Sequence, residues 1–78
     1  MKVRLYAHLR EIAGTSEIDM PRLHSVPQLI AALSERYGNE FFELSRRSCF
    51  YVDGERVESA LPSNSSEVAI LPPVSGGC

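Results

Sequence analysis

The chain has 78 residues, with eight lysines and arginines against ten aspartates and glutamates and a net charge of −2. This length fits one small domain and leaves no room for a substrate cleft between two domains. The small net charge gives no general attraction to nucleic acid or to an anionic membrane, and no apolar run reaches the roughly 20 residues that span a bilayer. We therefore expect neither nucleic acid nor a membrane as a partner.

The first twenty residues have the pattern of two short strands joined by a helical turn. Apolar and polar residues alternate over residues 2–8, which predicts a half-buried strand. Residues 9–13 suit one helical turn that ends at Gly14, a residue able to take the left-handed conformation of a helix C-cap. Residues 16–20 alternate again before Pro21 and predict a second strand, antiparallel to the first.

The next segment predicts the main helix. Ser25 is a typical N-cap, Gln28 follows at the spacing of a capping box, and Pro27 lies in the first turn, where its missing N–H costs nothing. Apolar residues then recur at helical spacing, at Val26, Leu29, Ile30, Leu33 and Tyr37. Gly38 marks the expected end of this helix.

The second half of the chain predicts a hairpin and a final strand. Residues 41–44 are ambiguous and fit either a short second helix or an irregular loop. Residues 48–52 are rich in β-forming residues and precede Asp53-Gly54, a typical type I′ hairpin turn. After a polar turn, residues 67–71 predict a strand that is central in the sheet, because it lacks polar alternation after its first residue.

This order of elements predicts an α+β fold of the β-grasp type that is seen in ubiquitin. We expect a mixed sheet of four to five strands crossed by one main helix. The right-handed crossover rule places the first and last strands side by side and parallel in the middle of the sheet. The expected organisation is a β-grasp domain over residues 1–71 and a flexible, extended C-terminal tail over residues 72–78.

Outside the tail, the sequence predicts no self-contained active site. His8 and His24 have no companion ligands at metal-binding spacing, so no metal site is expected. Cys49 and Cys78 do not form a disulfide framework, and no signal-peptide pattern precedes the first strand. We therefore expect a reduced, cytoplasmic protein in which Cys49 is a small core residue.

The most informative segment is the tail Pro72-Pro73-Val74-Ser75-Gly76-Gly77. Two prolines keep the chain out of helical conformations, and the two glycines, which lack a Cβ, allow a partner's backbone to close tightly around them. Six extended residues span about 20 Å. Fraying at a chain end explains glycine and serine but not a proline pair directly after a core strand. The pattern therefore favours an arm that enters a partner's pocket.

The chain resembles the small subunit of molybdopterin synthase, the MoaD family, over essentially its whole length. Residues 3–14 are similar to the family's opening strand with its Leu-Arg and Ala-Gly pairs, and residues 67–77 resemble its closing run more specifically. The helix from Val26 and the turn over residues 52–55 fit between them. Related carriers of the thiamine pathway share the fold and the double glycine, but the Pro-Pro-Val-Ser approach is more typical of the molybdopterin branch.

This resemblance implies a sulfur carrier that is not catalytic alone and binds no cofactor itself. In the family, a ubiquitin-activating-type adenylyltransferase uses ATP to adenylate the terminal glycine carboxylate, which is then converted to a thiocarboxylate. The large subunit of molybdopterin synthase receives this sulfur for the molybdenum cofactor. By position, Gly77 carries the sulfur and Gly76 gives clearance beside it. The segment that both partners grip comprises Pro72, Pro73, Val74 and Ser75.

Cys78 departs from this family pattern. While Cys78 is attached, the carbonyl of Gly77 is part of a peptide bond, so no free carboxylate exists for adenylation. We expect a metalloprotease of the deubiquitinase type to remove Cys78 before activation. The alternatives are a persulfide carried on the Cys78 thiol and a residue added in cloning.

Two other classes of function stay open on the sequence. The chain fits a sulfur carrier for thiamine, a sulfur amino acid or a thiolated natural product. It also fits a ubiquitin-like modifier that forms isopeptide bonds to lysines, or a plain interaction module. The partner surface outside the tail is not fixed, and Phe50, Tyr51 and Val57 fit either such a surface or the core.

Overall fold

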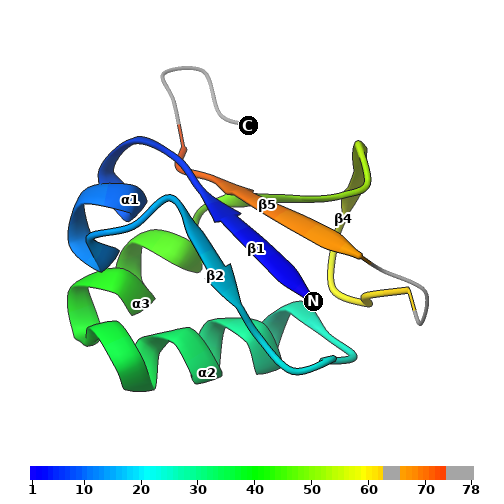
Figure 1. Ribbon diagram of the computed structural model, residues 1–78, viewed down its shortest axis with the longest axis horizontal. Helices are drawn as coiled ribbons and strands as arrows, with labels where there is room; N and C mark the ends of the chain where they lie inside the picture. Colours follow the sequence, from blue (N-terminus) through cyan, green and yellow to red (C-terminus); the bar gives the residue numbers. More distant parts are fainter. Residues whose placement is uncertain (63–65, 74–78) are drawn as a thin grey trace.

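The computed structural model describes residues 1–62 and 66–73 of the chain. In this part of the chain, three helices and five strands follow one another in the order predicted above (Figure 1). They are β1 (Lys2–Leu5), α1 (Ala7–Ala13), β2 (Glu17–Asp19), α2 (Val26–Tyr37), α3 (Asn39–Ser45), β3 (Cys49–Val52), β4 (Glu55–Val57) and β5 (Glu67–Leu71). The ambiguous segment over residues 41–44 is therefore helical.

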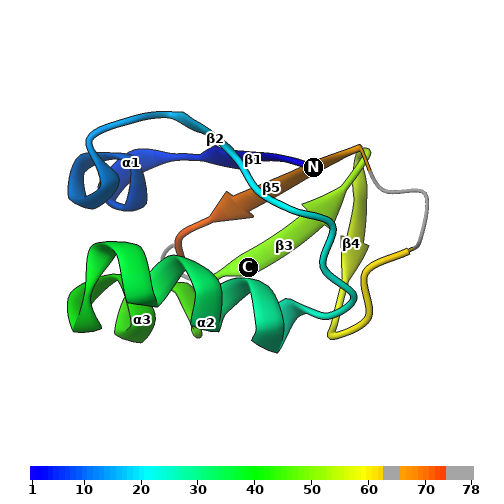
Figure 2. The ribbon, with the colours of Figure 1, turned by 60° about the horizontal axis from the view of Figure 1, so that its bottom comes forward.

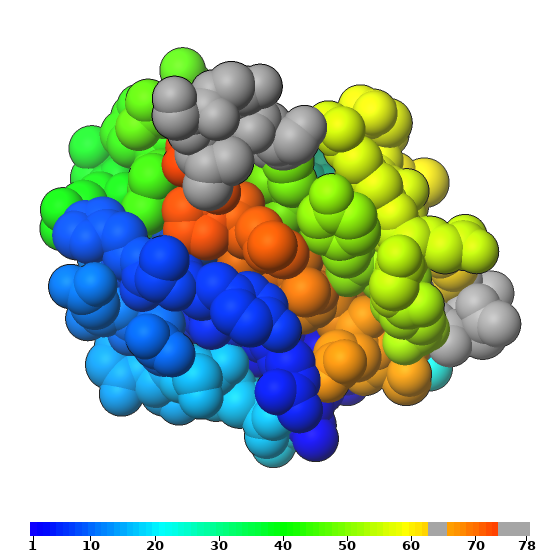
Figure 3. Space-filling model, turned by 90° about the horizontal axis from the view of Figure 1, so that it is seen from above, coloured from blue at the N-terminus to red at the C-terminus, as the bar shows by residue number. Residues whose placement is uncertain are grey.

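The strands form one mixed sheet in the order β2-β1-β5-β3-β4. β5 lies in the centre, parallel to β1 and antiparallel to β3, as the crossover rule predicted. The helices lie on one side of this sheet (Figure 2), and none of the described helices covers the opposite side, which we call the outer face (Figure 3). The β-grasp prediction is confirmed.

The core fills the space between the sheet and the helices. Its fully buried side chains come from β1, β5 and all three helices: Val3, Leu5, Leu9, Leu29, Leu33, Phe41, Val68 and Ile70. The ring of Phe41 lies 5.3 Å from that of Tyr37, centroid to centroid, so α3 packs against the end of α2. A helix as short as α3 is not stable in isolation, so the burial of Phe41 supplies the stabilisation that it needs.

The strand predicted over residues 2–8 ends at Leu5, and residues 7 and 8 belong to α1. Other local sequence signals act as expected at the ends of the elements. The Ser25 hydroxyl accepts a hydrogen bond from the Gln28 N–H at 3.2 Å, and the His24 N–H donates to Oε1 of Gln28 at 3.0 Å. Gly14 ends α1 with a left-handed φ of 76°. Asp53 and Gly54 have φ values of 48° and 89°, as the hairpin turn between β3 and β4 requires.

Cys49 is a small buried residue, as expected, and lies beside the main core cluster. In β3 the side chains of Phe50 and Val52 belong to the core cluster, and Cys49 does not. By the alternation of a strand, Cys49 lies on the side of Tyr51, opposite Phe50 and Val52, and it is 4% exposed. The burial of Cys49 agrees with the prediction of a small core residue, and its redox state stays a prediction.

The tail begins where β5 ends. Leu71 is the last residue of β5, and Pro72 and Pro73 follow outside any strand or helix. The predicted boundary between residues 71 and 72 stays a prediction, since residues 74–78 lie outside the described part of the chain.

Candidate functional site

The candidate site is the end of β5 from which the tail leaves the sheet. Figure 2 shows β5 between β1 and β3. Its pairing with β1 continues to Leu5↔Ile70, and its pairing with β3 continues to Cys49↔Leu71. Ile70 and Val68 are fully buried beneath it. A partner that pulls on the tail therefore pulls against hydrogen bonds on both sides of β5 and against core packing, which gives the tail a fixed base.

Only part of the predicted site falls within the described residues. Pro72 and Pro73 are half-buried and directly continue β5. The other predicted site residues, Val74, Ser75, Gly76, Gly77 and Cys78, lie outside the described residues. Their roles stay predictions.

Two large hydrophobic side chains are exposed in the described part of the chain, and both lie beside the base of the tail. Leu71 is 38% exposed and Tyr6 is 40% exposed. Because Leu5 pairs with Ile70 in the parallel register, Tyr6 and Leu71 follow at the same end of two neighbouring strands. We call Tyr6, Leu71, Pro72 and Pro73 the tail-base patch. Figure 3 shows β1, in blue, directly beside β5 on the outer face.

The sequence analysis missed Tyr6 and Leu71 as surface candidates. The available signal was an aromatic residue at a polar position of the β1 alternation, and an apolar residue on the opposite side of β5 from Ile70. The three residues that the sequence left open as a partner surface are mostly internal. Phe50 belongs to the core and Val57 packs against it, while Tyr51 is half-buried, opposite Ala69 in the sheet register.

Charged side chains extend across β2, β1 and β5 at the other end of the outer face. We call Lys2, Arg4, Glu17 and Glu67 the ionic ladder. Nε of Arg4 donates to Oε1 of Glu67 at 2.6 Å, and its Nη2 lies 3.5 Å from Oε1 of Glu17. Nζ of Lys2 lies 3.7 Å from the other Glu17 oxygen. These pairs are exposed and screened by water, so they contribute little to stability.

Arg4 is the titratable group of the outer face whose pKa is clearly shifted. The hydrogen bond to Glu67 raises the pKa of the Arg4 guanidinium, and the negative charges of Glu67 and Glu17 raise it further. A guanidinium is already charged at every pH at which proteins fold, so the positive charge at the centre of the ladder is permanent. The outer face thus has a charged end and an apolar end, and the tail leaves from the apolar one.

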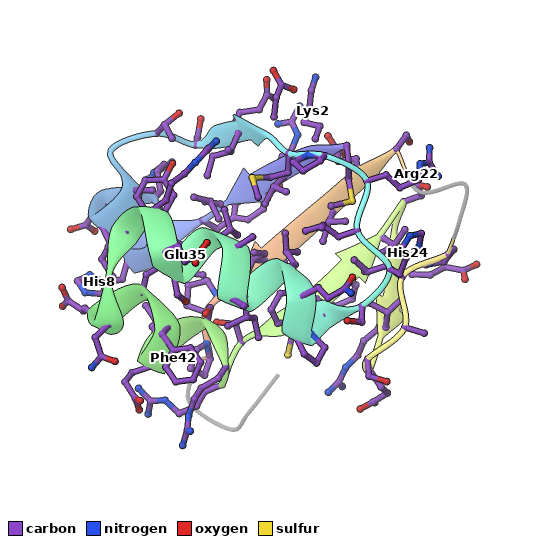
Figure 4. All side chains as sticks on the ribbon, turned by 90° about the horizontal axis from the view of Figure 1, so that it is seen from below. Lys2, His8, Arg22, His24, Glu35 and Phe42 are labelled. Carbon is purple, nitrogen blue, oxygen red and sulfur yellow. The ribbon has the colours of Figure 1, made fainter. Side chains whose placement is uncertain are left out.

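The histidines do not form a site together. Figure 4 labels His8 and His24 at opposite ends of the helical layer. Nε2 of His8 lies 3.4 Å from Oε2 of Glu40, which joins α1 to α3. Across residues 1–62 and 66–73, no group of three histidines, cysteines, aspartates or glutamates is placed to hold a metal ion. Over the same residues, no helix has the length and apolar character needed to cross a membrane.

Solved structures similar to the chain have the same fold. SAMP1 from Haloferax volcanii is 27% identical, covers 97% of both chains and has a TM-score of 0.63. A candidate molybdopterin converting factor, subunit 1, from Pyrococcus furiosus is also 27% identical, covers 94% of this chain and 95% of its own, and has a TM-score of 0.67. A structure of H. volcanii small archaeal modifier protein 1, at 23% identity and a TM-score of 0.60, supports the fold alone.

Comparison with curated proteins gave no match. The model of the ThiS family, in contrast, matches residues 3–77, from the first strand to the second glycine of the tail. This span takes in the sheet except Lys2, the helical layer and the tail up to Gly77, and leaves out Cys78. The chain belongs to the ThiS family, with the ubiquitin-like β-grasp fold of its structural neighbours.

Proposed function

We propose that this chain is the sulfur carrier of molybdopterin synthesis, acting through Gly77 as the small subunit of molybdopterin synthase. The observation that carries the proposal is the way in which β5 holds the base of the tail. A central strand, paired on both sides, runs directly into Pro72-Pro73 and toward the double glycine. The similarity to the P. furiosus candidate molybdopterin converting factor supports the molybdopterin branch.

The chemistry requires a free carboxylate at Gly77. An oxygen of that carboxylate attacks the α-phosphorus of ATP in an adenylyltransferase and releases pyrophosphate. A sulfur nucleophile then attacks the acyl carbon and expels AMP, which leaves a thiocarboxylate. Any residue after Gly77 blocks the first step, so Cys78 must be removed beforehand, and a metalloprotease of the deubiquitinase type suits this cleavage. The family match that ends at Gly77 supports this assignment.

The described residues serve this chemistry by docking. The tail-base patch offers apolar area beside the tail, and its burial against a partner excludes water around the arm that enters the partner's channel. The ionic ladder, at the other end of the same face, favours one orientation of that partner through its fixed charges. The same patch serves the adenylyltransferase and the large subunit in turn, because both must grip the same arm.

The test compares the 78-residue chain with a version that ends at Gly77. Each is incubated with the adenylyltransferase, ATP and a sulfide source, and its intact mass is measured. We expect the version ending at Gly77 to exchange one oxygen for sulfur, and the 78-residue chain to stay unchanged. A version ending at Gly76 is the matched control for tail length. Absence of the exchange in the version ending at Gly77 would overturn the carrier proposal.

The pathway is tested separately with the thiocarboxylated chain. Mixed with the large subunit and cyclic pyranopterin monophosphate, it is expected to yield molybdopterin and to return to the carboxylate form. A stable thiocarboxylate that transfers no sulfur to this acceptor would argue for a carrier of another pathway, such as thiamine synthesis.

A second candidate function is protein modification, which the similarity to SAMP1 favours. A modifier uses the same adenylate but transfers the Gly77 acyl group to a lysine amine. Tryptic digestion of conjugates would then give lysines that carry residues 57–77, because the last tryptic site of the chain follows Arg56. If such conjugates form in cells whose molybdopterin synthesis does not need the chain, the modifier is favoured over the carrier.

A further inference from the structure

The outer face of the sheet carries opposite charges at its two edges. Strand alternation places Glu17 and Asp19 of β2 on this face at one edge and Arg56 of β4 at the other, and all three are exposed. Among the described residues, the guanidinium of Arg56 makes no ion pair. Glu17 is held by the long contacts of the ionic ladder, at 3.5 and 3.7 Å. Both edges therefore keep charge that a second surface can pair.

A row of directly paired residues joins the two edges across the outer face. In the order of the strands, the row comprises Glu17, Arg4, Ala69, Tyr51 and Arg56. Its centre is Ala69, the middle residue of β5, which Figure 3 shows in orange between β1 and β3. Ala69 has the smallest side chain of the row, so a second surface can approach the sheet closely at this point.

This row is complementary to a copy of itself in one orientation. A two-fold axis along β5 brings β2 of one copy opposite β4 of the other, and β1 opposite β3. Glu17 then faces Arg56 of the second copy. Arg4 faces the ring of Tyr51, which attracts a cation, and Ala69 faces Ala69. An axis across the strands would instead place Arg4 opposite Arg4 and Glu17 opposite Glu17, which like charge disfavours.

We propose that a second copy of this chain docks on the outer face and forms a symmetric dimer with its two-fold axis along β5. The same axis brings together the exposed Leu71 side chains of both copies, which buries apolar area at the tail-base end. Glu67 also lies near the axis, but each Glu67 carboxylate accepts a hydrogen bond from Arg4 of its own chain at 2.6 Å. The two carboxylates therefore do not meet as unpaired charges.

The size of the outer face makes this dimer a weak one. Strands about 4.8 Å apart, with about 3.3 Å per residue, give the five-stranded sheet an outline of roughly 19 by 17 Å. Contact over such an outline falls in the class of small, transient interfaces, below about 1,200 Å² of total buried area. We therefore expect monomers at low concentration and dimers at roughly 0.1–1 mM.

The dimer covers the tail-base patch of both copies. A second copy and the adenylyltransferase then compete for the same surface, so concentrated carrier is masked from activation. This consequence rests on the proposed function, whereas the dimer itself does not. The experiment below therefore measures the dimer alone.

The dimer is tested by sedimentation equilibrium of the 78-residue chain, in dithiothreitol so that no disulfide links two chains. Between about 10 µM and 2 mM, we expect the average mass to rise from one chain toward two. E17R and R56E each place like charges opposite each other, so each should raise the dissociation constant at least about tenfold. R36E changes the net charge as R56E does but lies on α2, on the other side of the sheet (Figure 2), and should leave the constant unchanged.

An equimolar mixture of E17R and R56E tests the direction of the axis. When one chain of each variant meets the other, the two replaced side chains face each other with opposite charge, and so do the retained Glu17 and Arg56. The mixture should therefore recover dimers close to the unsubstituted affinity.

Three outcomes would overturn the proposal. A mass of one chain at every concentration would exclude the dimer, and equal weakening by R36E would exclude the outer face as its interface. Absence of recovery in the mixture would exclude the axis along β5. None of these readouts uses the adenylyltransferase, so a failure here differs from a failure of the carrier proposal.

Discussion

Among the described residues, Ala7 is the one whose backbone departs most from what its side chain prefers. Its φ of 51° lies in the left-handed region, where a Cβ meets the following carbonyl oxygen. This conformation turns the chain sharply from β1 into α1, with Tyr6 still extended before it. The strain is therefore located directly beside the tail-base patch, at the junction that sets the position of Tyr6.

Replacement Ala7→Gly is expected to stabilise the protein by about 1 kcal/mol, because glycine takes this φ without the steric penalty. Urea unfolding measures the change. The control is Ala31→Gly, at an exposed position inside α2, where the same replacement should destabilise by about 1 kcal/mol. Two replacements with effects of the same sign would contradict the assignment of strain to Ala7.

The N-terminus of α2 is held both by a local cap and by a contact with a segment far away in the sequence. Its N-terminus is held by the Ser25 hydroxyl, and also by the segment before Leu61. The Val26 N–H donates to the Ser59 carbonyl at 2.7 Å, and the Leu61 N–H donates to the His24 carbonyl at 3.0 Å. Two backbone hydrogen bonds between segments far apart in the sequence thus support the side-chain cap.

Replacement Ser25→Ala removes the side-chain cap and should lower the free energy of unfolding by about 1 kcal/mol. Ser59→Ala is the matched control, since Ser59 offers α2 its backbone carbonyl, which alanine keeps. We expect the control to lie within about 0.5 kcal/mol of the unsubstituted protein by the same unfolding measurement. A loss at Ser59 as large as at Ser25 would show that the contact between the segments, and not the cap, holds the helix.

At the scale of the whole molecule, the two faces of the sheet have separate tasks. The inner face forms the core with the helices, and the outer face carries the tail-base patch and the ionic ladder. The two faces can be compared through one residue type, since Leu33 packs against the inner face and Leu71 lies on the outer face. Leu33 is fully buried, whereas Leu71 is exposed beside the tail. Replacing each of these leucines in turn therefore tests stability and partner binding separately.

Leu33→Ala is expected to destabilise the protein by about 2–5 kcal/mol, since it leaves a cavity under the sheet. Leu71→Ala should cost about 1 kcal/mol or less in stability. In a binding titration with the adenylyltransferase, Leu71→Ala should instead weaken affinity about tenfold, as loss of a central apolar contact does. Unchanged affinity of Leu71→Ala, with Tyr6→Ala equally unaffected, would remove the tail-base patch from the docking surface.

Much of this architecture was determined by the sequence alone, because its signals are local. Alternation in β1, the Ser25 cap, the Asp53-Gly54 turn and the apolar run of β5 each act through neighbouring residues. Each predicted element is present, although the strand predicted over residues 2–8 ends at Leu5. The Pro-Pro and Gly-Gly pairs likewise predict, without any tertiary information, that the tail is the functional segment, and this stays a prediction.

Tertiary structure decided what depends on residues far apart in the chain. Residues 41–44 are helical because Phe41 finds a buried place against Tyr37, which no local pattern shows. Tyr6 and Leu71 form one patch because strand pairing joins residues that are 65 positions apart, from 6 to 71. Buried Cys49 lies beside Leu71 at the base of the tail for the same reason. Pairing and helix cover assign each side chain to a face of the sheet, and both are properties of the folded chain.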